Sequence, residues 1–220
     1  AKLIPSVVKD ERCAVVLPDE SLLIPVLNSI PEEIRDINVT MGYPMKSSAF
    51  FDFLTLVGAM QMHLRQKDGK WYYYHSQVWS LFSSGIFRKV TFGDKAVRDR
   101  IKRIKEDMKY YIPQEDLAGI PLFDLLFRPA VTDPKSTSGE QIRAFADYQK
   151  TLVKGLAPRL AEDLSMGIEL ELAKAAYSAV SQLQAAGLEI LPMTYVRLLD
   201  QLLAPVSIPF NGEPLKGLQI

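Results

Sequence analysis

The sequence predicts a mainly helical α+β protein with a small parallel sheet built from both ends of the chain. Short segments rich in β-branched residues stand at 13–17, 37–41 and 206–210, and such runs are typical of buried strands. A turn and a helix-like segment separate the first two, and this β-α-β order favours parallel pairing. Between residues 49 and 203 the apolar residues recur mostly at helical spacing.

The first half of the chain is expected to contain three clear helices. Residues 21–30 follow a Pro-Asp-Glu-Ser turn that suits a helix N-cap. Residues 49–64 are apolar almost all round, which indicates a buried helix. Residues 72–74 indicate a strand that continues as a helix from Ser76. Residues 94–111 carry apolar side chains at three- and four-residue steps, which predicts the clearest amphipathic helix.

Proline and glycine divide the second half of the chain. A short helix is expected at 121–127, and residues 134–139 (PKSTSG) are the clearest loop. Residues 140–186 have a helical pattern, with breaks expected near 155–158 and at 165–167, because glycine and proline disfavour a helix interior.

The chain returns to strand at its end. A last helix is expected at 194–203, after Gly187 has closed the preceding helix as its C′ residue. Residues 206–210 and 217–220 then resemble strands. Chain ends are more often polar and frayed, so an apolar end predicts either that the fold continues beyond the given sequence or that the last strand docks in the sheet.

Composition restricts the class of protein. The 26 basic and 26 acidic residues give a formal net charge of zero, so any contact with a nucleic-acid backbone has to come from a local patch. The single cysteine, Cys13, allows no disulfide within the chain, which favours a reducing, cytoplasmic location. No apolar run reaches the length of about 18 residues that a membrane-spanning helix needs. We therefore expect no membrane association.

The sequence contains no complete active site. The glycine patterns that cradle phosphates or carry a nucleophilic serine are absent. The two histidines, His63 and His75, stand apart, and we interpret both as structural; a hydrolase that uses one of them beside carboxylates is the alternative. The acidic residues lack the spacing of a metal-dependent nuclease and indicate solvated helix faces, so neither a metal nor a cofactor is predicted.

One basic stretch is the electrostatic candidate. Residues 95–109 hold seven basic residues, against four acidic ones at 94–107. Such a local excess suits phosphate groups; the alternative is an ordinary charged helix face held by pairs four residues apart. The residues selected as DNA contacts are Arg98, Arg100, Lys102 and Arg103.

An aromatic cluster precedes this stretch. Trp71, Tyr72, Tyr73, Tyr74 and Trp79 lie within nine positions. Aromatic rings of this kind can stack nucleobases. Packing in the core, or an interface with another subunit, is the alternative.

Residues 13–54 (CAVVLPDESLLIPVLNSIPEEIRDINVTMGYPMKSSAFFDFL) resemble the start of the second RecA-like core in AddB-type subunits of bacterial helicase–nucleases. The tail SIPFNGEPLKGLQI is similar to the segment before the next helicase motif of that family. This resemblance implies that residues 1–48 and 204–220 form a partial RecA-like core, and that 49–203 is a helical insertion of the superfamily 1 kind.

The resemblance also implies where the chemistry lies. In that family the ATP-binding loop belongs to the preceding core and a PD-(D/E)xK nuclease site to the following domain. Mg²⁺ and ATP would therefore serve the parent protein, and this fragment alone would be non-catalytic and without a cofactor. The family turn near the single strand is matched here by Gly42, Tyr43, Lys46, Ser47 and Ser48. A plain cap for the buried helix is the alternative role of that turn.

The function implied is a contribution to DNA double-strand-break repair and recombination, through contact with a single DNA strand or as a scaffold for an AddA-type helicase–nuclease subunit. A free-standing helical domain that binds another protein, without DNA, is the alternative. Apolar ends that serve as partner surfaces would favour the alternative.

Overall fold

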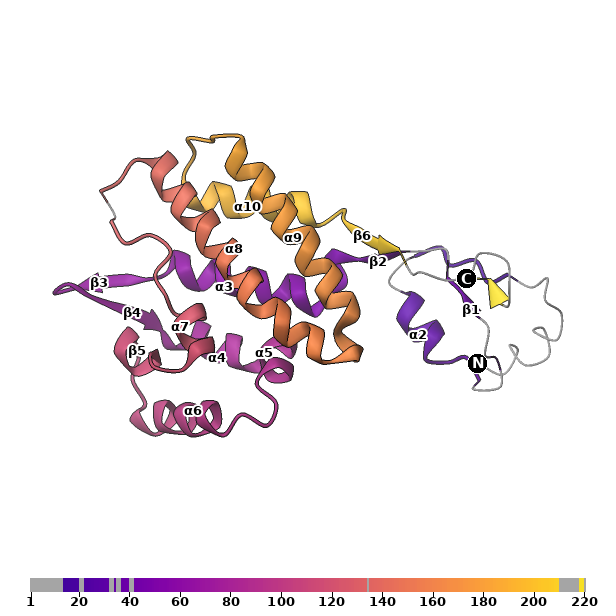
Figure 1. Cartoon of the computed structure of the whole chain (residues 1–220), viewed down its shortest axis with the longest axis horizontal. Coiled ribbons are helices and arrows are strands. Elements are labelled where there is room, and N and C mark those ends of the chain that lie inside the picture. Colours follow the sequence, from indigo (N-terminus) through magenta and orange to yellow (C-terminus); the bar gives the residue numbers. More distant parts are fainter. Residues whose placement is uncertain are drawn as a thin grey trace.

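The computed structural model describes residues 14–19, 22–31, 34, 37–39, 42–133, 135–209 and 218–219. It is a mainly helical α+β structure, as predicted. Figure 1 shows a large helical part joined by two neighbouring strands to a smaller part near both chain ends. We call residues 45–206 the body, and the two connecting strands, β2 (Gly42–Pro44) and β6 (Ser207–Pro209), the neck.

Helices dominate the body. They are α3 (Ala49–Met62), α4 (His75–Ser83), α5 (Gly85–Val90), α6 (Lys95–Asp107), α7 (Pro121–Leu126), α8 (Ser138–Glu162), α9 (Gly167–Ala185) and α10 (Pro192–Leu203). Three 3₁₀ turns and three strands complete it: η2 (Met45–Ser47), η3 (Gln114–Leu117), η4 (Leu164–Met166), β3 (Arg65–Lys67), β4 (Lys70–Tyr74) and β5 (Tyr111–Pro113). The smaller part contains α2 (Leu23–Leu27), β1 (Ile37–Asn38) and β7 (Leu218–Gln219).

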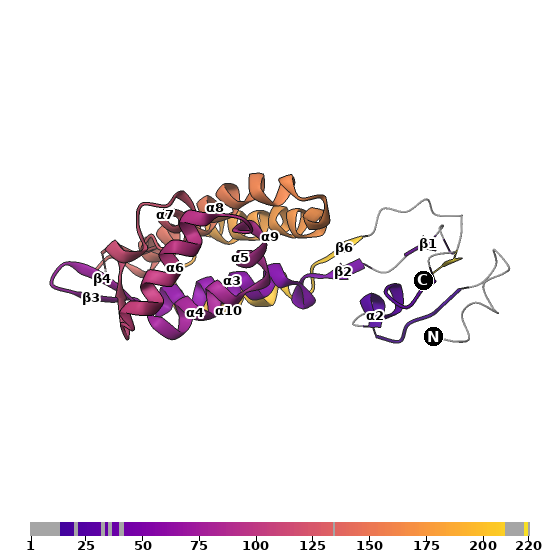
Figure 2. The same cartoon turned by 90° about the horizontal axis from the view of Figure 1, so that it is seen from below.

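Two separate hydrophobic cores hold the described residues together. The larger one runs through the body, from Met45 to Leu203, and the smaller one surrounds Leu23 next to the neck. In the body, α8 and α9 lie side by side (Figures 1 and 2) and pack over α3 and α10. An aromatic cluster fills the space between α4, α5 and α7, made of Phe82, Phe87, Phe123 and Phe127.

The end of α7 is fixed by buried side chains. Three consecutive main-chain carbonyls accept their hydrogen bonds: Leu126 O from Tyr148 Oη at 2.7 Å, Phe127 O from Tyr73 Oη at 2.6 Å, and Arg128 O from Gln61 Nε2 at 3.0 Å. Carbonyls at a helix end have no partner within the helix. Side chains from α8, β4 and α3 supply the missing donors here, so this helix end ties three elements together.

The expectation of one parallel sheet is wrong. Among the strands that the structure describes, β1 and β7 alone pair in parallel, over two residues. The neck strands are antiparallel, with Tyr43 opposite Ile208, and β3, β4 and β5 form an antiparallel sheet within the body. The antiparallel pairing of the neck strands follows from the path of the chain. Since β2 leads into the body and β6 leads out of it at the same place, the two neighbouring strands run in opposite directions.

Three other predicted elements need correction. Residues 15–17 form no strand, and Cys13 lies outside the described residues. The amphipathic helix ends at Asp107 rather than at 111, because Met108 adopts the left-handed conformation (φ 46°) and Tyr111 begins β5. The helix expected at 21–30 is shorter, at Leu23–Leu27.

A predicted break near residues 155–158 is absent. The helix α8 runs without interruption through Gly155 and Pro158. A Cβ atom on Gly155 would lie 2.5 Å from Leu125 Cδ2, so this glycine permits close packing of α7 on α8 instead of ending a helix. By contrast, the break expected at 165–167 is confirmed by η4, and the C′ role of Gly187 by its φ of 60°.

Candidate nucleic-acid interface

A groove of about 460 Å³ lies between α4 and the end of α6. Its lining is aromatic, apolar and basic: His75, Trp79, Ile104, Lys105, Met108, Lys109 and Tyr110. Two chain connections create it. The strand β4 runs directly into α4, and α6 runs through a short turn into β5, which pairs with β4 so that Tyr74 stands opposite Tyr111. The sheet therefore holds the two helices at a fixed separation.

Aromatic rings form one wall of the groove. Ring centroids lie 4.6 Å apart for His75 and Tyr110, 5.1 Å for Tyr74 and Tyr110, and 5.2 Å for Tyr110 and Tyr111. Tyr110 remains 60% exposed, and the Arg65 guanidinium lies 4.6 Å from the Tyr111 ring centroid. These rings are held by their neighbours before any ligand arrives, so stacking on them costs little ordering of side chains.

His75 is oriented by the main chain. Its Nδ1 atom lies 3.0 Å from Tyr110 O, and its backbone N–H donates to the same oxygen at 3.1 Å. A carbonyl oxygen only accepts hydrogen bonds, so Nδ1 must carry the proton. His63 likewise contacts the carbonyl of Ala59, at 2.7 Å. For both rings the recorded polar partner is a main-chain carbonyl, which supports their structural interpretation.

The basic side chains of α6 divide into two groups. Lys95, Arg98, Lys102 and Lys105 follow each other at steps of three, four and three residues, so they share one face of the helix. We call these four residues the cation stripe; all four are exposed. Lys105 belongs both to the stripe and to the groove. The stripe therefore extends the basic edge of the groove along the helix.

Arg100 and Arg103, which the sequence predicts as DNA contacts, lie off this stripe. The Arg100 guanidinium donates to the main-chain oxygens of Asp116 at 2.8 Å and Ala118 at 2.6 Å, and thereby anchors η3 to α6. Arg103 lines a separate hollow together with acidic residues, which are Glu106, Asp107, Glu115 and Asp116. Of the four predicted arginines and lysines in α6, only Arg98 and Lys102 share a face with the groove.

Lys109 is partly neutralised by its neighbours. Its Nζ lies 2.6 Å from an Asp116 carboxylate oxygen and 3.3 Å from one of Asp107. The hydrogen bond to Asp116, followed by that to Asp107, raises the pKa of Lys109 above its ordinary value. Lys109 thus stays charged, but it offers a ligand less net charge than Lys105 does.

The turn predicted from the resemblance lies elsewhere. Gly42 and Tyr43 belong to β2 in the neck, and Lys46 belongs to η2, which follows it directly. The strand β2 lies well away from α6 in both views (Figures 1 and 2). A Cβ atom on Gly42 would lie 2.0 Å from Ser207 Oγ, so the glycine permits the neck strands to pair. Burial, then the charges of Glu169 and Asp52, raise the pKa of Tyr43, which indicates an acidic surrounding.

Ser47 and Ser48 have structural contacts in that turn. Ser47 O accepts a hydrogen bond from Tyr43 Oη at 3.2 Å. The Ser48 hydroxyl accepts from Phe51 N at 3.0 Å and donates to Met45 O at 2.6 Å. Since Ser48 is buried and caps α3, the structure supports the capping role that the sequence leaves open for this turn.

The sequence-level selection misses most of the groove. It omits Met108 and Tyr110, and it counts Lys105 and Lys109 only as part of a basic stretch. One signal was available in the sequence, namely the three-four-three spacing of cations from Lys95 to Lys105. Tyr73, by contrast, is fully buried and belongs to the core.

Two searches of the described part of the chain gave negative results. No three side chains of His, Cys, Asp or Glu gather there in a way that could hold a metal ion. No helix in it is both long and apolar enough to cross a membrane. Comparison of the chain with models of protein families, with curated proteins and with solved structures found no match.

We expect Met108→Gly to stabilise the protein while weakening the groove. Met108 is left-handed at the end of α6 and 87% exposed. A non-glycine residue in this conformation costs about 1 kcal/mol, and little burial is lost on its removal. The midpoint of thermal unfolding should rise by about 2–4 °C. A Met108→Ala variant, which keeps the Cβ atom, is the control and should show no such rise.

Proposed function

We propose that this chain is a non-catalytic region that contacts a single nucleic-acid strand, within a helicase–nuclease-like protein of DNA double-strand-break repair. The observation that carries the proposal is the groove between α4 and α6, where exposed Tyr110 and oriented His75 stand beside Lys105. Bases have two faces that stack on aromatic rings, and phosphates require nearby cations. The groove offers both within one site.

The size of the groove supports a base rather than a duplex. Its volume of about 460 Å³ falls within the range of sites for small molecules, whereas a duplex presents its bases only at the floor of its grooves. The neutral composition of the chain fits a contact that involves few phosphates. A single strand, whose bases are free to turn outward, is therefore the favoured ligand.

The assignment to an AddB-type parent remains a proposal that rests on the sequence resemblance. The parallel pairing of Ile37–Asn38 with Leu218–Gln219 supports a RecA-like core to which both segments 1–48 and 204–220 contribute. ATP and Mg²⁺ would act elsewhere in that parent. Residues 49–203, which make up most of the body, would then be the helical insertion that carries the strand contact.

A second candidate function is a scaffold for an AddA-type subunit. It is favoured by exposed apolar side chains at the start of α10, Leu191 (67% exposed) and Met193 (50%). They stand next to Pro192, which lines an open hollow with Trp71 and Phe145. Exposed apolar patches mark protein interfaces more often than nucleic-acid sites. Co-purification with such a subunit is the measurement that tests this role.

Replacement of groove residues should weaken strand binding selectively. We expect Tyr110→Ala to lower the affinity for a fluorescein-labelled oligothymidylate about tenfold, because one stacked base is lost. Lys105→Glu should lower it by a similar factor and reduce the salt dependence by about one unit of slope. Fluorescence anisotropy of the full chain measures both effects.

The matched control is Lys135→Glu, since Lys135 is also exposed but lies in the loop before α8. Circular dichroism should show unchanged helix content in all three variants. Absence of binding by the unaltered chain, or an equal loss with Lys135→Glu, contradicts the proposed function.

A further inference from the structure

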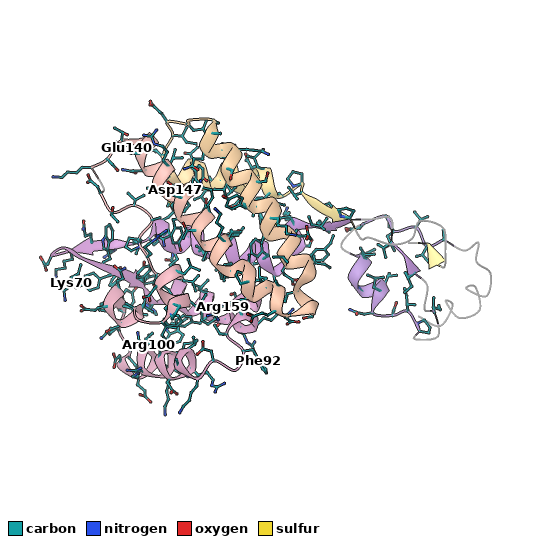
Figure 3. The ribbon with its side chains drawn as sticks, in the orientation of Figure 1. Lys70, Phe92, Arg100, Glu140, Asp147 and Arg159 are labelled. Carbon is teal, nitrogen blue, oxygen red and sulfur yellow. The ribbon has the colours of Figure 1, made fainter. Side chains whose placement is uncertain are left out.

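A phenylalanine is held almost fully in solvent at the start of α6. Phe92 is 92% exposed, and it lies in the turn between α5 and α6 at the edge of the body (Figure 3). Large apolar side chains on a protein surface are ordinary when they are loosely placed. Phe92 differs, because the turn that presents it is fixed on both sides.

Several hydrogen bonds fix this turn. Phe92 N donates to Lys89 O at 3.1 Å, and Asp94 N donates to Thr91 O at 3.0 Å. The buried Thr91 hydroxyl donates to Phe87 O at 2.7 Å. From α8, the Arg159 guanidinium donates to Val90 O at 3.1 Å. The main chain around Phe92 therefore cannot easily fold the ring back onto the body.

Basic residues stand before and after Phe92 in the chain. Arg88 and Lys89 precede it on α5, and Lys95 opens the cation stripe two residues after Gly93. The nearest acid in sequence, Asp94, accepts a hydrogen bond from Val97 N at 3.1 Å and so caps α6. An exposed ring with basic residues before and after it in the chain suits a ligand that has both flat apolar faces and negative charge.

The helix α6 connects Phe92 with the groove. Its 13 residues span about 20 Å. Phe92 lies three residues before its first residue, and Tyr110 lies three residues after its last. Between them run the four residues of the cation stripe. An aromatic residue thus stands in the chain before and after the cation stripe, whose four residues lie on one face of α6.

We propose that a single nucleic-acid strand lies along α6, with its phosphates over the cation stripe, one base against Phe92 and another in the groove beside Tyr110. This inference rests on the proposed function and defines its footprint. The length of α6 fits about four nucleotides, the lower end of the site sizes of known single-strand domains. Lys102 exchanges its 3.8 Å contact with Glu106 for a phosphate, which costs little because that pair is exposed.

The footprint is tested with oligothymidylates of two, four and eight nucleotides and the full chain. Phe92→Ala should weaken binding of the eight-nucleotide strand about tenfold and leave the dinucleotide unaffected, since a dinucleotide is too short to reach from the groove to Phe92. Phe92→Trp should preserve binding, because it keeps a flat ring at the same place.

A matched pair on α6 tests the stripe. Arg98→Glu should weaken binding of the eight-nucleotide strand about tenfold and lower the salt slope by about one. Arg103→Glu, an equal charge reversal on another face of the same helix, should leave both unchanged. Equal effects of the two reversals, or an eight-nucleotide affinity that Phe92→Ala does not change, overturn the footprint.

Failure of the footprint is distinguishable from failure of the proposed function. If the unaltered chain binds no oligonucleotide, the proposed function and the footprint are both refuted. If Tyr110→Ala weakens binding but Phe92→Ala and Arg98→Glu do not, only the footprint falls. Vesicles of phosphatidylserine and phosphatidylcholine provide a further arm: loss of vesicle binding on Phe92→Ala, with unchanged strand affinity, assigns the ring to a membrane and overturns the inference.

Discussion

Replacement of Phe123 by alanine is expected to lower the free energy of unfolding by about 4 kcal/mol. Phe123 is fully buried, and its ring stacks on Phe82 at 5.5 Å and meets Phe127 edge to face at 5.3 Å. The change removes the buried ring, leaves a cavity between α4, α5 and α7, and breaks these ring contacts. Urea unfolding followed by circular dichroism measures the loss.

Phe92→Ala is the matched control for Phe123→Ala. The same side chain is removed, but from a site that is 92% exposed, so the free energy of unfolding should change by no more than about 0.5 kcal/mol. The two variants should also differ in function, because Phe92→Ala should retain the fold and lose strand affinity. Similar stability losses in both would contradict the packing described for α7.

Gln61→Leu is expected to lower the free energy of unfolding by about 3 kcal/mol. The Gln61 side chain is buried in α3; its Nε2 donates to Arg128 O at 3.0 Å, and its Oε1 accepts from Ala130 N at 3.0 Å. Leucine fills a similar volume but leaves a donor and an acceptor of the main chain without their partner. Each such buried group costs about 1–3 kcal/mol.

Gln66→Leu is the corresponding control, because Gln66 is exposed on β3. A change within about 0.5 kcal/mol is expected there. Hydrogen exchange should add a local signature: the Ala130 amide should exchange faster in Gln61→Leu than in the unaltered protein. An unchanged midpoint together with unchanged exchange at Ala130 is the result that would refute the role given to Gln61.

Helical periodicity predicted the larger elements of the body well, because it reports which face is buried. The buried helix α3, predicted at 49–64, is found at Ala49–Met62, and α7 is found at Pro121–Leu126. Glycine and proline were less informative, since their effect depends on what packs against them. Gly155 makes room for Leu125, and long-range contact of α8 with α9 outweighs the backbone cost of Pro158.

The hairpin of β3 and β4 has a recognisable signal in the sequence, the pair Asp68-Gly69. Asp68 and Gly69 both have positive φ, 51° and 74°. Asp-Gly is a preferred pair for two-residue hairpin turns because both positions require this conformation. Its recognition would have placed the strand at 70–74 in an antiparallel hairpin with residues 65–67.

The groove could not be predicted from the sequence in the same way. His75 and Tyr110 are 35 residues apart and meet only because β4 pairs with β5. The cation stripe, in contrast, is encoded locally by the spacing of Lys95, Arg98 and Lys102. Arg100 was predicted as a DNA contact, but its guanidinium donates to main-chain oxygens of Asp116 and Ala118. This contact depends on the fold of the loop after α6, which the spacing of residues within the helix does not reveal.

The neck has a consequence for how such a module can move between proteins. Its two strands pair residue for residue, Gly42 with Pro209 and Pro44 with Ser207, so the chain leaves the body one strand spacing, about 5 Å, from where it entered. The two residues that flank a surface turn in another protein lie a similar distance apart, and such turns tolerate insertions. The paired neck strands thus bring the two ends of the body close together, which is the geometry that an insertion into a surface turn requires.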